Sequence, residues 1–313
     1  MSTPLLVVVG PTASGKTSLA CALAQELGAE IVSADSQQCY RGLDAGTAKP
    51  TAEERGRAPH HLLDVADPEE QLDAALFVQL AEGAIADVAR RGKRVIVAGG
   101  TGLWLRALLR GLVEAPAASS EFRANLRQQI EREGLAAVHA RLSAVDPDAA
   151  GAIRPNDRVR IERALEVHAL TGRRLSELQR EHAFAQERHA ARVVQLLPPR
   201  DVLRDRIARR TRHLFESGAL ERETRWLLDR CERIPGARKA LKIIGYGEMA
   251  EVLAGRISRA QAEERVAART RQYAKRQRTW FAKEYGAPAE GWPPDAARLC
   301  ADAAQWYDAA SRR

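Results

Sequence analysis

Short apolar blocks alternate with amphipathic blocks in the first third of the chain, and this pattern predicts strands and helices in turn. The run Leu-Leu-Val-Val-Val at residues 5–9 predicts a buried strand, which is followed by a glycine-rich loop and a helix reaching about Leu27. Two further strands are predicted at residues 29–34 and 94–98, and the second ends at Gly99-Gly100-Thr101-Gly102. Strands that alternate with helices predict an α/β fold built on a parallel, doubly wound sheet.

A long amphipathic block separates the second of these strands from the third. Residues 69–91 have apolar side chains at helical spacing, which predicts a helix. The residues on one face of that helix are Leu72, Leu76, Leu80 and Ala84. A shorter helix is predicted after Gly102, with Leu103, Leu105 and Leu108 as its apolar residues.

The pattern changes in the middle of the chain. Residues 116–189 contain no convincing strand and predict short helices. The expected breaks between these helices are Gly134, Asp146-Pro147 and Pro155-Asn156. We therefore expect residues 1–115 to form the first part of a core, residues 116–189 to form a helical insertion domain, and residues 190–313 to complete the core.

The last third returns to long, regular elements. Residues 191–197 predict a strand, and residues 200–216 predict a charged helix that ends before Gly218. Ser258 is a suitable N-cap for a further long helix that reaches about Tyr285.

The composition is that of an ordinary globular protein, with 45% hydrophobic and 29% charged residues. The cysteines are far apart and show no metal-ligand or redox spacing, so we expect buried, reduced thiols in a cytoplasmic protein. They are Cys21, Cys39, Cys231 and Cys300. The apolar stretches are too short to cross a bilayer, and the run at 5–9 lacks the basic flank of a secretory signal.

The positive charge is concentrated toward the C-terminus. The net charge is +8, yet residues 1–113 contain 11 Lys and Arg against 13 Asp and Glu. Residues 193–313 contain 25 against 16. Such an excess suggests a polyanionic partner, with nucleic acid favoured over membrane, although arginines that merely solvate helices would give the same count.

The segment from Gly10 to Thr17 matches the phosphate-loop pattern G-x-x-x-x-G-K-[ST] completely. It follows a predicted strand and opens a predicted helix, which is the context that the pattern requires. Backbone amides in such a loop surround phosphate oxygens, Lys16 adds a cation, and the Thr17 hydroxyl can bind Mg²⁺. The ligand could be ATP in a kinase or a diphosphate that acts as a leaving group.

A carboxylate ends the next predicted strand. Because the carboxyl ends of parallel strands face one crevice, Asp35 is expected near the phosphate site, where it could hold Mg²⁺ or act as a general base. A turn or helix-cap role would also explain it. Thr101 is expected at the same crevice, or as part of a simple turn. His60-His61 has no third ligand at a suitable spacing, and we interpret it as a structural pair.

Residues 265–283 combine seven basic residues with Tyr273, Trp280 and Phe281, and they contain no acid. An exposed helix usually mixes both signs of charge to gain ion pairs along its surface. Phosphate contacts would offset the self-repulsion, and the aromatic rings could stack on unpaired bases. The alternative is a basic face whose aromatic residues belong to the core.

Taken in order, these segments resemble the tRNA dimethylallyltransferase family, the tRNA isopentenyltransferases, in its bacterial form. The resemblance runs from Gly10 to Phe281, and its most specific parts are Gly46-Thr47-Ala48-Lys49-Pro50 and Ala274-Lys275-Arg276-Gln277. Other matching parts are Asp35-Ser36-Gln37-Gln38, Pro59-His60-His61-Leu62-Leu63-Asp64, Asn156-Asp157 and Ile244-Gly245-Tyr246. Members of the family often have arginine at the positions that Lys242 and Gly247 occupy in this chain.

The resemblance implies a P-loop NTPase-like α/β fold and a reaction. The family transfers a dimethylallyl group from dimethylallyl diphosphate to the exocyclic amine of the adenosine 3′ of a tRNA anticodon. Asp35 matches the general base, and Thr101 and Arg210 match residues at the diphosphate site. The diphosphate, with Mg²⁺ on Thr17, is expected at Gly10, Thr12, Ala13, Ser14, Gly15, Lys16 and Thr17.

The resemblance also implies four stretches that touch the tRNA anticodon stem-loop. It places the helical insertion on the tRNA side, and we expect the protein to be a monomer. The first two are Asp35, Ser36, Gln37 and Gln38, and Val159, Arg160, Ile161, Glu162 and Arg163. The third is Lys242, Ile243, Ile244, Gly245, Tyr246 and Gly247. The fourth is Lys275, Arg276, Gln277, Arg278, Thr279, Trp280, Phe281 and Ala282.

Two other functions share parts of this pattern. A P-loop small-molecule or nucleotide kinase would use the same loop and could use Asp35 as a base, but it leaves the basic last third unexplained. A non-catalytic RNA-binding ATPase would not require Asp35 and Thr101 to converge.

Overall fold

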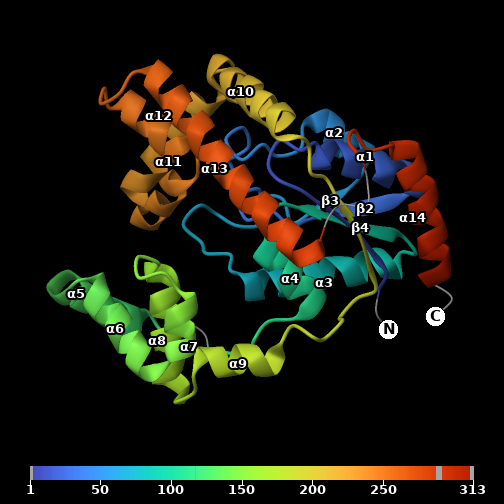
Figure 1. Cartoon of the computed structure of the whole chain (residues 1–313). Helices are drawn as coiled ribbons and strands as arrows, with labels where there is room; N and C mark the ends of the chain where they lie inside the picture. The colour runs from blue at the N-terminus through green and yellow to red at the C-terminus, as the bar shows by residue number, and fades with distance from the viewer. Residues whose placement is uncertain (1–2, 117, 287–290, 311–313) are drawn as a thin grey trace. The chain divides into compact units, whose positions relative to one another are not determined.

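A five-stranded parallel sheet forms the centre of the computed structural model, which describes residues 3–116, 118–286 and 291–310. Its strand order is β3-β2-β4-β1-β5. The strands are β1 (Leu5–Val9), β2 (Ala29–Ser33), β3 (His60–His61), β4 (Arg94–Gly99) and β5 (Ala191–Gln195). Figure 1 shows these strands with helices on both sides. The predicted α/β class and parallel sheet are confirmed.

The two faces of the sheet bury alternate residues of β1, as the two-residue period of a strand requires. Leu5, Val7 and Val9 pack on the side of α3 (Ala74–Arg90) and α4 (Gly102–Arg110). Leu6 and Val8 pack on the side of α1 (Lys16–Leu27) and α14 (Ala296–Ala310). Because both faces are covered, every residue of β1 is buried, which explains its unbroken apolar run.

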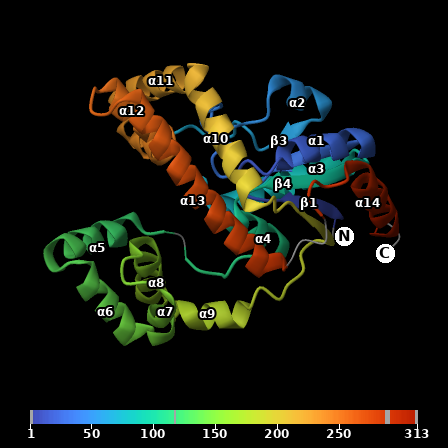
Figure 2. The same ribbon diagram turned by 45° about the horizontal axis from the view of Figure 1, so that its top comes forward.

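A third apolar cluster lies beyond the sheet and consists of helices from the last third of the chain. It joins α10 (Arg200–Glu216), α11 (Ala219–Arg233), the 3₁₀ helix Pro235–Lys242, α12 (Tyr246–Leu253) and α13 (Arg259–Tyr285). Its largest fully buried side chain is Tyr246. Figure 2 shows the α13 helix, about 40 Å long, running from α12 toward α4. It contributes Val266 to this cluster and Phe281 to the sheet core.

The helix predicted over residues 69–91 begins later and faces another way. Asp73 caps α3 by accepting hydrogen bonds from the amides of Ala75 and Leu76. Its buried stripe is Phe77, Ala81, Ile85 and Val88. The face expected from Leu72, Leu76, Leu80 and Ala84 is therefore wrong by about one residue, and Leu76 is 40% exposed. Stacking of Phe77 on Trp104, with ring centroids 4.4 Å apart, fixes the inward direction.

Residues 110–187 form a compact unit of their own, close to the range expected for the insertion. The unit contains α5 (Ser120–Glu133), α6 (Leu135–Val145), α7 (Pro147–Ala152), α8 (Arg158–Thr171) and α9 (Leu175–His182). All three predicted breaks lie at boundaries between these helices, and Asp146 caps α7, which begins at Pro147. Its core includes Leu126, Val138, Leu142 and Ile161.

The remaining predictions on the fold have mixed outcomes. The helix with Ser258 as its N-cap is confirmed from Arg259 to Tyr285. The short helix α2 (Ala52–Arg57), and α11, α12 and α14, were not predicted. Three cysteines are buried, but Cys300 is partly exposed. Across the described ranges, none of the helices combines the length and apolarity that a membrane span needs.

Candidate active site

The phosphate loop connects the end of β1 to the first turn of α1, as the sequence predicts. Its amides are not all available to a ligand. The Thr12 N–H donates to the Gln277 side-chain oxygen at 2.8 Å, and the Ser14 N–H donates to the Pro11 carbonyl at 3.2 Å. The first-turn amides of a helix lack intrahelical acceptors, so Lys16 and Thr17 offer theirs to an anion. The predicted diphosphate contacts of Thr12 and Ser14 cannot therefore come from their amides in this conformation.

Lys16 lines a cavity of about 960 Å³ together with Thr17, Asp35, Arg206 and Arg210. Its ammonium group makes no hydrogen bond or ion pair within the described ranges. Burial lowers the pKa of Lys16 below its ordinary value of 10.5, and the charge of Asp35 partly offsets this shift. A cation held without a close partner is a ready site for an anionic ligand.

Two arginines from α10 reach the phosphate loop. The Arg210 guanidinium donates to the Thr12 hydroxyl at 3.1 Å, and that of Arg206 donates to the Ser14 carbonyl at 3.2 Å. Burial lowers the pKa of Arg210, while Asp35 opposes the shift. The sequence prediction included Arg210 and missed Arg206, although the two are four residues apart and so share one helix face.

Asp35 lies just beyond β2, in a turn that is tied to the end of β4. One Asp35 carboxylate oxygen accepts the Gln37 amide at 3.0 Å. The Thr101 hydroxyl accepts the Ser36 amide at 2.9 Å and donates to the Ser36 hydroxyl at 3.2 Å. Thr101 is thus brought next to Asp35, but its hydroxyl is occupied in holding the Asp35 turn.

A second cavity, of about 690 Å³, adjoins the first. Both are lined by Thr12, Asp35, Thr47, Arg210 and Leu214. The second is also lined by Ile244, Tyr273 and Arg276. Asp35 is therefore accessible from the Lys16 side and from the side of α13. The expected proximity of the acid to the phosphate loop is borne out by this geometry.

Tyr273 is one of the aromatic residues in the basic segment 265–283, and the structure places it at the second cavity. It lies on the wall of the second cavity, and burial together with the charge of Asp35 raises the pKa of its phenol. The Arg276 guanidinium lies 5.7 Å from the Tyr273 ring centroid. The ring and the cation offer a planar, positively charged surface that suits a base.

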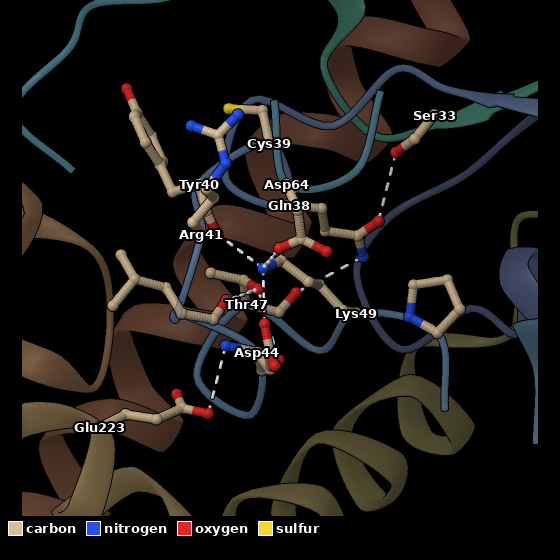
Figure 3. A network of polar contacts seen from close by, with 12 residues as sticks. Ser33, Gln38, Cys39, Tyr40, Arg41, Asp44, Thr47, Lys49, Asp64 and Glu223 are labelled. Atoms are coloured by element: carbon tan, nitrogen blue, oxygen red, sulfur yellow. Dashed lines mark hydrogen bonds and ion pairs between the residues drawn. The ribbon is translucent and has the colours of Figure 1, made fainter. Parts of the chain in front are cut away.

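The segment that follows Asp35 is held by a buried lysine. Lys49 is 8% exposed, and its ammonium donates to the Tyr40 carbonyl at 2.6 Å and pairs with Asp44 and Asp64. Gln38 joins the network by donating to the Ala48 carbonyl at 2.9 Å. Figure 3 shows Lys49 surrounded by these oxygens. The Gly-Thr-Ala-Lys motif thus serves to fix the wall of the site.

Glu223 of α11 holds the same segment from the other side. Its carboxylate accepts the amide of Asp44 at 3.2 Å (Figure 3). It also accepts the amide of Ala45 at 2.8 Å. The Tyr246 hydroxyl donates to it at 2.5 Å. No motif flagged Glu223, because α11 was not predicted and a single glutamate in a charged sequence carries no signal.

Several residues expected to touch tRNA have buried side chains. In α13, Gln277 and Phe281 are 5% and 0% exposed. Tyr246 and Ile161 are fully buried, whereas Val159 is 76% exposed. A buried side chain cannot contact an external ligand in this conformation. Direct contact by these stretches therefore remains a prediction for their exposed residues only.

The basic stretch of α13 separates into paired and unpaired cations. Arg265 pairs with Glu251, Arg269 pairs with Glu248, and Arg278 donates to the Pro198 carbonyl. In the part of the chain that the structure describes, the exposed residues Arg271, Lys275, Arg276 and Lys283 have no acidic partner. The unpaired group is available to an external polyanion.

Gly247, where the family often has arginine, packs tightly in this chain. A Cβ atom there would lie 2.6 Å from the Leu241 carbonyl oxygen. Arginine at this position would therefore require a local shift of the backbone. Lys242 is exposed and lines the second cavity.

Metal binding has limited support from protein groups alone. The described residues contain no cluster of three or more His, Cys, Asp or Glu side chains that could hold an ion. The Thr17 hydroxyl and the Asp35 carboxylate line one cavity with Lys16. This donor set fits Mg²⁺ that takes its other ligands from a diphosphate and water.

The His60-His61 pair is structural, as interpreted from the sequence. The His61 ring lies 2.7 Å from the Glu30 carboxylate, and a His60 ring nitrogen lies 2.8 Å from the Ala58 carbonyl oxygen. Hydrogen bonds from Arg91 lower the pKa of Glu30 to about 2. These contacts fix the edge strand β3, and His60 also lines a small pocket with Thr17 and Asp35.

Comparison with known proteins gives one consistent family. A family model described as IPP transferase matches residues 38–284. A tRNA dimethylallyltransferase from Anaeromyxobacter dehalogenans is 56% identical over 282 residues, which cover 90% of this chain and 93% of that protein. A tRNA dimethylallyltransferase from Myxococcus xanthus is 50% identical over 297 residues, which cover 94% of each.

Two crystal structures resemble the chain over most of its length. A tRNA isopentenylpyrophosphate transferase from Bacillus halodurans has a TM-score of 0.69 and 35% identity, covering 99% of this chain and 98% of that one. A eukaryotic dimethylallyltransferase acting on tRNA has a TM-score of 0.76 and 29% identity, covering 90% of this chain and 70% of that one.

Proposed function

We propose how the two adjoining cavities of this chain, which belongs to the IPP transferase family together with the tRNA dimethylallyltransferases described above, perform prenyl transfer to tRNA. Dimethylallyl diphosphate binds in the cavity of Lys16, and the exocyclic amine of the adenosine 3′ of the anticodon enters through the cavity of Tyr273. The observation that carries this proposal is the position of Asp35, which lines both cavities.

The reaction needs one bond to form and one to break. The adenine amine attacks the first carbon of the dimethylallyl group, the carbon–oxygen bond to the diphosphate breaks, and the diphosphate leaves with the electron pair. The amine is a poor nucleophile because its lone pair is delocalised into the ring, and it gains strength as it loses a proton. We assign that proton to the Asp35 carboxylate, with Asp35 as the general base.

The leaving diphosphate must be stabilised as its charge develops. Lys16 and the first-turn amides of α1 supply positive charge from the loop. Arg210 and Arg206 supply it from α10, and each already contacts the loop. We propose that Thr17 would hold Mg²⁺ together with the bound diphosphate, and that the ion would supply further charge neutralisation while the Asp35 carboxylate stays free to accept the proton. Thr101 acts by holding the Asp35 turn.

The acceptor base must leave the stacked anticodon loop, which costs a few kcal/mol. We propose that contacts between RNA phosphates and the unpaired cations Arg271, Lys275 and Arg276 offset this cost. The ring of Tyr273 then offers a stacking surface inside the cavity. The helical unit of residues 110–187 is proposed to face the tRNA as well, through exposed residues such as Val159 and Arg160.

Family membership also bears on the fold type, the cellular location and the oligomeric state. We propose that the sheet is P-loop NTPase-like, which is supported by a phosphate loop that follows a central parallel strand. A tRNA substrate implies work in the cytoplasm, and we propose that one chain is sufficient, because one chain supplies both cavities. The kinase alternative lacks support among the relatives and leaves the cations of α13 without a ligand.

The function is tested by incubating the purified protein with Mg²⁺, dimethylallyl diphosphate and bulk tRNA, followed by digestion and mass analysis of the nucleosides. We expect a prenylated adenosine that appears only when all three are present. Phosphate transfer from ATP without any prenylated nucleoside would contradict the proposal and support the kinase.

A further inference from the structure

Gln277 connects the two parts of the site through a buried side chain. Its amide oxygen accepts the Thr12 N–H at 2.8 Å, and its amide nitrogen donates to the Gly100 carbonyl at 2.9 Å. The side chain is 5% exposed. A Cβ atom on Gly100 would lie 2.4 Å from the Gln277 amide nitrogen, so a side chain there would displace the Gln277 amide. One side chain of α13 therefore joins the phosphate loop to the loop after β4.

The opposite face of α13 carries the unpaired cations. Arg271, Lys275 and Arg276 are exposed, while Ala274, Gln277 and Phe281 are buried at helical spacing. If the proposed function holds, this helix contacts RNA on one face and the phosphate loop on the other.

The α13 helix is packed tightly enough to transmit a change in position. The Trp280 indole lies so close to Gly102 that a Cβ atom there would be 2.1 Å from its ring nitrogen. The Arg106 guanidinium lies 4.5 Å from the Trp280 ring centroid, and Arg106 pairs with Glu284. Because the buried face is closely packed, a displacement of α13 would alter the hydrogen bonds of Gln277 rather than be absorbed by empty space.

We propose that Gln277 is a positioning residue that couples the two substrate sites. Its hydrogen bonds orient the phosphate loop, so that RNA held on α13 strengthens diphosphate binding at Lys16. Linkage requires the reverse effect as well, with diphosphate strengthening RNA binding by the same factor. This inference rests on the proposed function, because it presupposes that both ligands bind.

The test replaces Gln277 with methionine, which has similar length and volume but cannot form either hydrogen bond. The change leaves the Thr12 amide without its acceptor, which is unfavourable in a buried position. The probes are inorganic pyrophosphate with Mg²⁺ and an RNA anticodon stem-loop, each titrated with and without the other. Gln79→Ala, an exposed change on α3, serves as the control.

In the unaltered protein we expect the stem-loop to strengthen pyrophosphate binding about fivefold or more. In Gln277→Met this factor should fall toward one, while the affinity for the stem-loop alone is retained. Should Gln277→Met fail to fold, Gln277→Asn takes its place, since its amide is too short to bridge both loops.

The outcomes separate the coupling from the function itself. Loss of the coupling factor with retained RNA affinity supports the role of Gln277. An unchanged factor in Gln277→Met, or no coupling in the unaltered protein, overturns it even if prenylated adenosine is formed. If the unaltered protein forms no prenylated adenosine and binds neither probe, the proposed function fails together with the inference.

Discussion

The phosphate loop and the segment after β2 each contain a lysine, half-buried Lys16 and buried Lys49, and the two lysines differ in what surrounds them. Lys49 donates to the Tyr40 carbonyl and pairs with Asp44 and Asp64. Lys16 has no such partners among the described residues and lines an open cavity. Burial lowers the pKa of Lys16, because holding this charge away from water is unfavourable.

The difference shows which lysine is structural and which awaits a ligand. A buried cation whose hydrogen bonds are satisfied stabilises the fold around it. A half-buried cation without partners costs stability, and the proposed diphosphate ligand would offset that cost. Both lysines lie in glycine-containing motifs of the sequence, so only their surroundings distinguish them.

The largest expected effect comes from removing the unpartnered cation. Lys16→Met should reduce prenyl transfer by about 10²–10³-fold, because a preorganised charge at the leaving group is lost. The melting temperature should stay the same or rise, because a half-buried charge without a partner is removed. Transfer assays and thermal melts check both, with the exposed Lys93→Met as the control. A large fall in stability would show that Lys16 is a structural residue like Lys49 and would contradict the distinction between the two lysines.

Removal of Lys49, the lysine with acidic partners, should lower stability. Lys49→Met should lower the free energy of unfolding by about 1–3 kcal/mol, less than for a fully buried pair, because Asp44 and Asp64 are partly exposed. Urea denaturation measures this change. An unchanged stability with weaker pyrophosphate binding would mean that Lys49 is itself a ligand of the diphosphate.

The smallest effect concerns pH. Lys16 binds an anion only when protonated, and its lowered pKa means that it loses the proton at a lower pH than an ordinary lysine. Pyrophosphate affinity should therefore fall as pH rises through this pKa, by at most about tenfold per pH unit for one proton.

Calorimetric titration of pyrophosphate with Mg²⁺ at several alkaline pH values measures this fall. Lys16→Arg stays charged throughout the range, so the same titration with that variant subtracts the ionisation of pyrophosphate itself. Identical pH profiles for the two proteins would contradict a binding role for Lys16.

The sequence predicted the parts of the site that short motifs encode. The phosphate loop is recognised by the spacing of its glycines, lysine and threonine from Gly10 to Thr17. Asp35 follows a predicted strand whose end must face the same crevice. Arg210 came from resemblance alone, since one arginine in a helix rich in arginine carries no pattern.

The features that the sequence does not predict depend on contacts between segments that are far apart in the chain. Gln277 lies in a stretch that reads as uniformly polar, so its inward direction appears only when α13 meets Thr12 and Gly100. Glu223 lies in a helix that was not predicted. The phase of α3 was wrong because the stacking of Phe77 on Trp104, rather than the regular leucine spacing, decides which face is buried.

Replacement of Asp35 by asparagine tests the central claim most directly, because it preserves shape and the hydrogen bond to the Gln37 amide while removing the proton acceptor. The account predicts that transfer falls by about 10²–10⁴-fold, while the affinities for pyrophosphate and for the anticodon stem-loop stay the same. A loss of RNA affinity as large as the loss of transfer, or transfer at the unaltered rate, would contradict the role of Asp35 as the general base between the two cavities.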